Sequence, residues 1–165
     1  MYLISLYFDD KTNEKINQLK KQIMESTKNF SVKDIPCHIT LASFYCEEIE
    51  NILNDIDIKE GIIDFVSIGI FKNTVFIQPI VNDYLQETMI KVHNRLNKIP
   101  SIKKSNRYLP NQWICHVTIG KHLTDKEILS SIESIQNEFK PFKGKIIKIG
   151  LAKSNPYHDI YIKSV

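Results

Sequence analysis

The sequence contains two copies of one short pattern that could do chemistry. Cys37-His38-Ile39-Thr40 and Cys115-His116-Val117-Thr118 both have the order Cys-His-aliphatic-Thr, and their histidines are 116 − 38 = 78 residues apart. Random placement of the chain's His and Thr residues would give two such matches at corresponding positions about once in a thousand sequences. We therefore interpret the pair as functional rather than as two ordinary strand histidines.

Two imidazoles and two hydroxyls suit acid–base chemistry at a phosphate. The ordinary pKa of imidazole is about 6.5, so His38 and His116 can give or take a proton near neutrality. On opposite sides of a phosphorus, one ring would deprotonate the attacking oxygen and the other would protonate the leaving oxygen. The hydroxyls of Thr40 and Thr118 would donate hydrogen bonds to the non-bridging oxygens. Such a scheme uses no metal and no cofactor, and we expect neither.

The elements around the two motifs must bring them together. We expect strands over residues 38–45 and 113–120, on which alternate side chains face opposite sides, so that each His shares a face with its Thr. If the two halves of the chain pack about a pseudo-two-fold axis, the two His/Thr pairs meet across a central cleft.

The pattern of the other elements also repeats. Periodicity predicts further strands at 2–8, 62–71, 75–80, 145–152 and 157–163, and helices at 11–29, 47–57, 83–99 and from 124 to just before 141. Each half then has the order helix, strand, helix, hairpin. The sequence therefore predicts one α+β domain over residues 1–165, with lobes of roughly 1–80 and 81–165, two antiparallel sheets and flanking helices.

Length, composition and charge limit the class of protein. The 165 residues are 42% hydrophobic and 25% charged, which is the balance of one folded soluble domain. A net charge of +3 is compatible with an anionic ligand. The odd number of cysteines, three, does not form a disulfide scaffold and favours a reducing, cytoplasmic location. No uncharged stretch is apolar enough to span a bilayer, so we expect no membrane association.

The motif strands resemble a known family. His38-Ile39-Thr40-Leu41 and His116-Val117-Thr118-Ile119 are similar to the paired signature of the two-histidine (2H) phosphoesterase superfamily, which includes 2′-5′ RNA ligase-like proteins and RNA cyclic phosphodiesterases. The resemblance covers nearly the whole chain. It implies a bilobal fold and action on 2′,3′-cyclic phosphates or 2′-5′ linkages of RNA ends or small cyclic nucleotides, with possible joining by the same site.

The resemblance also assigns residues. It implies that His38 and His116 are the acid/base pair, and that Thr40 and Thr118 bind phosphate. It adds Lys121, after the second motif, and Tyr157, in the last turn, as substrate-binding residues. It implies a monomer without a metal. In many relatives a proline precedes the catalytic histidine, whereas this chain has Cys37 and Cys115 there.

Other interpretations of the same residues remain open. A zinc site built from Cys37, His38, Cys115 and His116 is opposed by geometry, because adjacent strand residues face opposite sides. An RNA-end-binding module without turnover, or a phosphoesterase acting on a non-RNA cyclic phosphate, would have the same motifs. Aromatic rings that could stack on a base, or simply pack in the core, are Phe44, Phe71, Tyr108 and Trp113, and a basic loop carries Lys103, Lys104 and Arg107.

Overall fold

The computed structural model describes all 165 residues as strands, helices and their connections. The strands are β1 (Tyr2–Phe8), β2 (His38–Tyr45), β3 (Gly61–Phe71), β4 (Thr74–Pro79), β5 (Lys103–Lys104), β6 (Val117–Gly120), β7 (Phe142–Ser154) and β8 (Tyr157–Ser164). The helices are α1 (Asp10–Thr27), α2 (Asp83–Asn97) and α3 (Asp125–Ile135), with a short 3-10 turn η1 (Asn106–Tyr108). None of the three helices combines the length and hydropathy needed to cross a bilayer.

The strands form one bent, antiparallel sheet. Their order is β5-β2-β1-β7-β3-β4-β6, and β8 pairs with β7 outside this path. The long β7 joins the two halves, because its first residues pair with β3 while the rest pair with β1 and β8. The predicted α+β fold is confirmed, and the two expected sheets are parts of one sheet that is continuous through β7.

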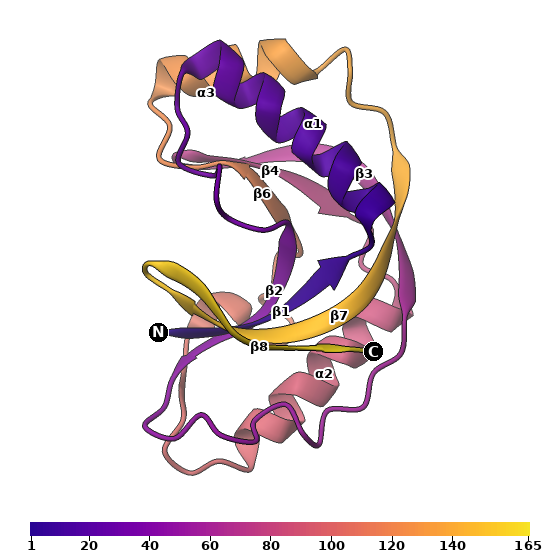
Figure 1. Cartoon of the computed structure of the whole chain (residues 1–165), viewed down its shortest axis with the longest axis vertical. Coiled ribbons are helices and arrows are strands. Elements are labelled where there is room, and N and C mark those ends of the chain that lie inside the picture. Colours follow the sequence, from indigo (N-terminus) through magenta and orange to yellow (C-terminus); the bar gives the residue numbers. More distant parts are fainter.

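The helices cover the outer faces of a crescent. In Figure 1, α1 and α3 lie together over the half that contains β4 and β6, and α2 lies against the half that contains β2. Each half of the crescent therefore contains elements from both ends of the sequence. The lobe boundary near residue 80 stays a prediction; α1 from the first half of the chain packs on β6 from the second.

Local sequence determines where the helices begin. Asp9 caps α1 by accepting a hydrogen bond from the Thr12 amide, and Ile16 and Ile23 of its apolar stripe are buried. The predicted capping box of α3 is present: Thr124 accepts from the Glu127 amide, and the Glu127 carboxylate accepts from the Thr124 amide.

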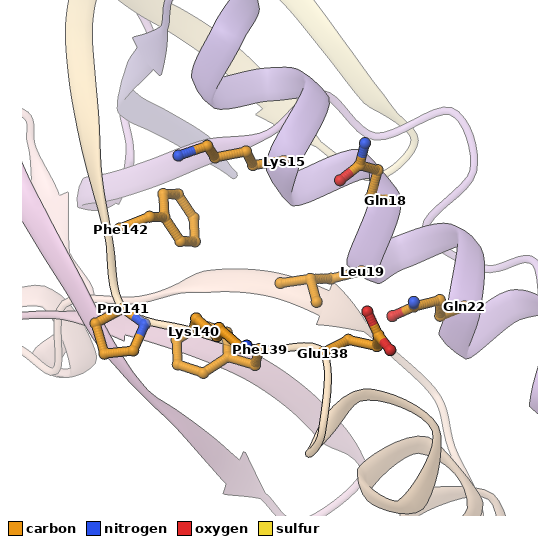
Figure 2. A pocket seen from close by; sticks show the side chains of 9 residues that line it. All are labelled: Lys15, Gln18, Leu19, Gln22, Glu138, Phe139, Lys140, Pro141 and Phe142. Atoms are coloured by element: carbon orange, nitrogen blue, oxygen red, sulfur yellow. The ribbon is translucent and has the colours of Figure 1, made fainter.

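A cavity of about 260 Å³ lies on the outer side of the sheet, between α1 and the segment that joins α3 to β7. Figure 2 shows Lys15 and Leu19 of α1 facing Phe139 and Phe142 across it. None of its lining residues belongs to the paired motifs.

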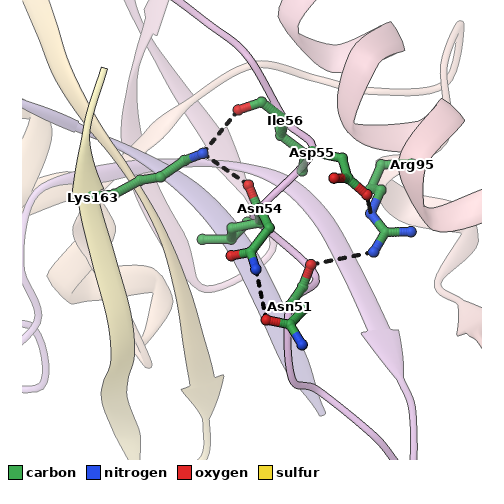
Figure 3. A network of polar contacts seen from close by, with 7 residues as sticks. Asn51, Asn54, Asp55, Ile56, Arg95 and Lys163 are labelled. Carbon is green, nitrogen blue, oxygen red and sulfur yellow. Dashed lines mark hydrogen bonds and ion pairs between the residues drawn. The ribbon is translucent and has the colours of Figure 1, made fainter.

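The predicted helix at 47–57 is wrong, because this segment is a series of turns. Asn51 has a left-handed backbone with φ of 60°, which interrupts a right-handed helix. In Figure 3, Arg95 of α2 donates to the Asn51 carbonyl, and Lys163 of β8 donates to the carbonyls of Leu53 and Ile56. The apolar pattern correctly indicated that Leu53 and Ile56 are buried. The carbonyls of this segment, however, accept hydrogen bonds from side chains that are distant in sequence.

The second motif strand is shorter than predicted. β6 begins at Val117, so His116 lies immediately before it rather than within it. The alternation nevertheless extends backward: Cys115, Val117 and Ile119 are buried, and His116 and Thr118 are half-buried on the other side. The predicted grouping of each histidine with its threonine on one face is therefore retained.

Candidate active site

The two motif histidines are anchored in the same way. The Nδ1 of His38 donates to the carbonyl of Pro36 at 2.8 Å, and the Nδ1 of His116 donates to the carbonyl of Ile114 at 2.7 Å. In each case the acceptor lies two residues before the ring. A carbonyl only accepts, so Nδ1 carries the proton, and Nε2 is left to exchange protons with a ligand.

The segments that carry the two histidines are joined to each other. Trp113, three residues before His116, donates its indole Nε1–H to the carbonyl of Thr40 at 2.9 Å, which joins the second motif segment to the first. β2 and β6 are side by side in the middle of the crescent (Figure 1). The charge of His116 lowers the pKa of His38, so the rings are within electrostatic range. The structure therefore brings together two imidazoles that are distant in sequence.

The threonines occupy corresponding rows of the sheet. Thr40 is opposite Ser5 of β1, which is opposite Gly150 of β7. Thr118 is opposite Phe76 of β4, which is opposite Gly69 of β3. Directly paired residues project from the same face of the sheet. Each threonine is two residues after its histidine, so the hydroxyl and the imidazole are also on one face.

A polar aromatic cluster surrounds His38. Its ring lies 5.1 Å from the ring of Tyr157, at an interplanar angle of 31°, and 6.2 Å from the ring of Tyr7. The hydroxyl of Tyr7 donates to Oδ1 of Asp159 at 2.6 Å, and the hydroxyl of Tyr157 donates to the same oxygen at 3.1 Å. Burial, with these bonds, raises the pKa of both tyrosines, so both hydroxyls are protonated. Tyr157, which the sequence predicts to bind substrate, therefore lies beside the first motif.

An apolar cluster surrounds His116. Its ring is edge-on to Phe71 at 5.1 Å and 5.2 Å from the ring of Phe76, and the two phenyl rings are 4.3 Å apart. These contacts have no hydrogen-bonding group, so they fix the imidazole by shape alone. Phe71, a predicted base-stacking residue, contacts the second histidine instead.

An aromatic ring that packs against each histidine lies over a glycine. A Cβ at Gly69 would lie 2.3 Å from the ring of Phe76, and one at Gly150 would lie 2.8 Å from the ring of Tyr7. Both rings pack over a backbone without a side chain. Each thus depends on close approach that only glycine permits.

Burial keeps both imidazoles neutral in the free protein. It lowers the pKa of His38 to about 4, although the Pro36 carbonyl and the Asp159 carboxylate oppose the shift. It also lowers the pKa of His116, opposed by the Ile114 carbonyl. An anion between the rings would favour their charged forms and raise both pKa values.

Other predicted residues lie farther from the histidines. Lys121 follows β6, and its carbonyl accepts a hydrogen bond from the Ser31 hydroxyl; no contact joins it to either imidazole. Lys103 and Lys104 form β5 at the edge of the sheet, beside β2. Phe44 is a core residue with no exposed surface.

The cysteines do not converge on the histidines. The Cys37 thiol donates to the Asn17 side chain at 3.3 Å, and Cys115 is fully buried in the core. Burial raises the pKa of both thiols. No group of three His, Cys, Asp or Glu side chains is arranged to hold a metal ion.

Three residues beside the histidines were not predicted from the sequence: Tyr7, Asp159 and Phe76. An acidic residue inside a strand is unfavourable, so Asp159 within the predicted strand 157–163 was the available signal. Tyr7 and Phe76 resemble ordinary strand aromatics, and only the register of neighbouring strands places them beside the histidines.

The fold is that of solved phosphoesterase structures, although the sequence is very different. E. coli LigT in complex with 3'-AMP is 11% identical, with a TM-score of 0.67 over 99% of this chain and 97% of LigT. A crystal structure titled only as a phosphoesterase is 14% identical, with a TM-score of 0.64 and coverage of 99% and 97%. LigT has also been crystallised with phosphate. No family model matches the sequence, and no curated protein matches it.

Proposed function

We propose that the protein is a phosphodiesterase that hydrolyses 2′,3′-cyclic phosphates of RNA ends or nucleotides, using His38 and His116 as an acid/base pair. One observation carries this proposal: two imidazoles, each fixed through Nδ1 by a carbonyl two residues earlier, have Nε2 free and lie on segments that the Trp113–Thr40 hydrogen bond joins. The fold shared with a phosphoesterase, and with LigT, whose structures include complexes with 3'-AMP and phosphate, supports the choice of substrate.

The reaction needs only the residues at hand. One imidazole takes a proton from water, whose oxygen attacks phosphorus, while the bond from phosphorus to the ribose 3′ oxygen breaks. The second imidazole gives its proton to that leaving oxygen, and the product is a 2′-phosphate. Thr40 and Thr118 donate hydrogen bonds to the non-bridging oxygens, on which negative charge builds up. With an RNA 5′-hydroxyl in place of water, the same step forms a 2′-5′ linkage.

The test is turnover of a panel of 2′,3′-cyclic nucleotides and 2′-5′ dinucleotides by wild type, His38→Ala and His116→Ala. Each variant should lose about 10²- to 10⁴-fold in rate while remaining folded, which a cooperative thermal transition checks. EDTA should leave the rate unchanged. Wild-type rates in either variant would reject the acid/base roles. Tight binding of RNA ends without turnover would instead favour a binding module.

A further inference from the structure

A second and larger cavity adjoins the first motif. It has a volume of about 500 Å³ and lies between α1, the segment leading into β2, and the β7–β8 hairpin. Pro36, which anchors His38, and Tyr7 and Asp159, which surround it, are part of its wall. The cavity is therefore continuous with the surroundings of His38.

The sheet register fixes how far this cavity extends from the imidazole. Tyr7 is directly opposite His38 on one side and directly opposite Lys148 on the other, so the three side chains form a row on one face. Adjacent strands are about 4.8 Å apart, which puts the Lys148 backbone about 10 Å from that of His38. A long side chain at that distance can reach a group one nucleotide away from the reacting phosphorus.

A buried ammonium group that forms no salt bridge lines the cavity. Lys20 is only 4% exposed, and its Nζ donates to the Ile35 carbonyl at 2.6 Å. An ammonium has three donors, so two are unused, and no ion pair compensates its charge. Burial lowers the pKa of Lys20, although the charges of Cys37 and Asp34 oppose the shift. Burying an ammonium group is costly unless an anion compensates its charge and accepts its hydrogen bonds.

The rest of the wall is suited to an anion. Lys33 and Lys148 are exposed at the rim, and the only acidic residues of the wall are Asp34 and Asp159. Asp159 already accepts hydrogen bonds from two tyrosine hydroxyls. Asn17, which also lines the cavity, accepts from Cys37 through its oxygen and so has its amide group left as a donor.

We propose that this cavity binds the phosphodiester next to the terminal cyclic phosphate of an RNA strand, through Lys20 and Lys148. The preferred substrate is then an oligonucleotide end rather than a free cyclic mononucleotide. The proposal rests on the proposed function for its orientation, because the terminal phosphate must lie between the histidines.

The experiment measures binding in a background that cannot turn over substrate. In His116→Ala protein, the Kd of a fluorescent tetraribonucleotide ending in a 2′,3′-cyclic phosphate is compared with that of 2′,3′-cyclic AMP. The tetranucleotide should bind more tightly. Lys20→Met and Lys148→Met should each weaken tetranucleotide binding by about tenfold and reduce the slope of log Kd against log salt by about 0.7, the value for one phosphate contact on a single strand.

Matched controls keep the result interpretable. Lys21→Met removes the neighbouring lysine of α1, which is exposed and paired with Glu25, and should change neither Kd nor slope. Thermal denaturation checks folding of Lys20→Met, and Lys148→Met changes an exposed side chain. Equal affinity for the two ligands, or loss of affinity for both in equal measure, would overturn the subsite. Discrimination between the ligands in a wild-type protein without turnover would retain the subsite and reject the proposed reaction.

Discussion

His38 and His116 have the same motif and the same Nδ1 anchor, but they lie in different surroundings. His38 contacts Tyr157 and Tyr7, whose hydroxyls converge on one carboxylate oxygen of Asp159. His116 contacts two phenylalanine rings that offer no polar atom. One imidazole is therefore near a negative charge and a network of hydrogen bonds, and the other is held by packing.

The difference shows what a duplicated motif does and does not determine. The four-residue pattern determines the direction of the ring, because strand alternation and a carbonyl two residues earlier act locally. The proton affinity of each ring depends on neighbours from other strands, and these differ between the halves. Pseudo-symmetry in sequence is thus compatible with unequal chemical roles.

The largest expected effect tests whether the two halves act equally on the phosphate. Thr40→Val and Thr118→Val remove one hydroxyl each and keep the shape of the side chain. Each should lower kcat by about ten- to a hundredfold, less than loss of a histidine, since one donor to the developing charge is lost. Steady-state kinetics on a 2′,3′-cyclic nucleotide measures this. A loss confined to one variant would mean that a single half binds the phosphate.

The second prediction concerns stability in acid. His38 has a pKa of about 4 in the folded protein and about 6.5 when unfolded, so the unfolded chain binds more protons between these values. The titration of His38 therefore has a negligible effect on the free energy of unfolding above pH 6.5. It lowers that free energy increasingly as the pH falls toward 4. When the pH is lowered from 7 to 5, the free energy of unfolding should therefore decrease by about 1–2 kcal/mol less in His38→Gln than in wild type.

Urea denaturation at the two pH values measures the difference, and its dependence on pH is the informative quantity, because the substitution also changes stability at pH 7. His116→Gln should change the pH dependence of the unfolding free energy in the same direction, because burial also lowers the pKa of His116. Equal loss of stability in wild type and His38→Gln would contradict a buried, neutral His38.

Much of the fold could be predicted because the signals are local. The stripe of Ile16 and Ile23 and the capping box at Thr124 each depend on residues within a few positions. The segment 47–57 could not be predicted, because Arg95 and Lys163, distant in sequence, decide its backbone. Periodicity indicates which side chains are buried more reliably than which hydrogen bonds the backbone makes.

The same limit applies to the site. The paired motifs were visible in the sequence, whereas the row formed by His38, Tyr7 and Lys148 exists only through strand register. One further signal was present. Lys20 follows Ile16 by four residues and therefore lies on the apolar stripe of α1, where a charged residue is unusual. A lysine on a buried stripe indicates a local requirement for charge.

A smaller effect tests the supports of the two rings. Gly150→Ala should displace the ring of Tyr7 and disturb His38, and Gly69→Ala should displace Phe76 and disturb His116. Each should lower kcat several-fold, about tenfold at most, because the imidazole is moved and not removed. Gly144→Ala, where the added Cβ would meet Phe65 and Thr12 instead, is the control for a general packing defect, and it should affect thermal stability without the same loss of kcat.

The smallest effect separates the two imidazoles by their charge environment. Burial lowers both pKa values, so kcat/KM for a cyclic nucleotide should be bell-shaped with its maximum below pH 6.5. Asp159→Asn keeps an oxygen that can accept from Tyr7 and Tyr157 but removes the charge that raises the pKa of His38. The limb that reports His38 should then move to lower pH, while the limb that reports His116 stays in place. Displacement of both limbs together would show that the carboxylate acts on the two rings equally, and the contrast between the two halves would then lie in packing alone.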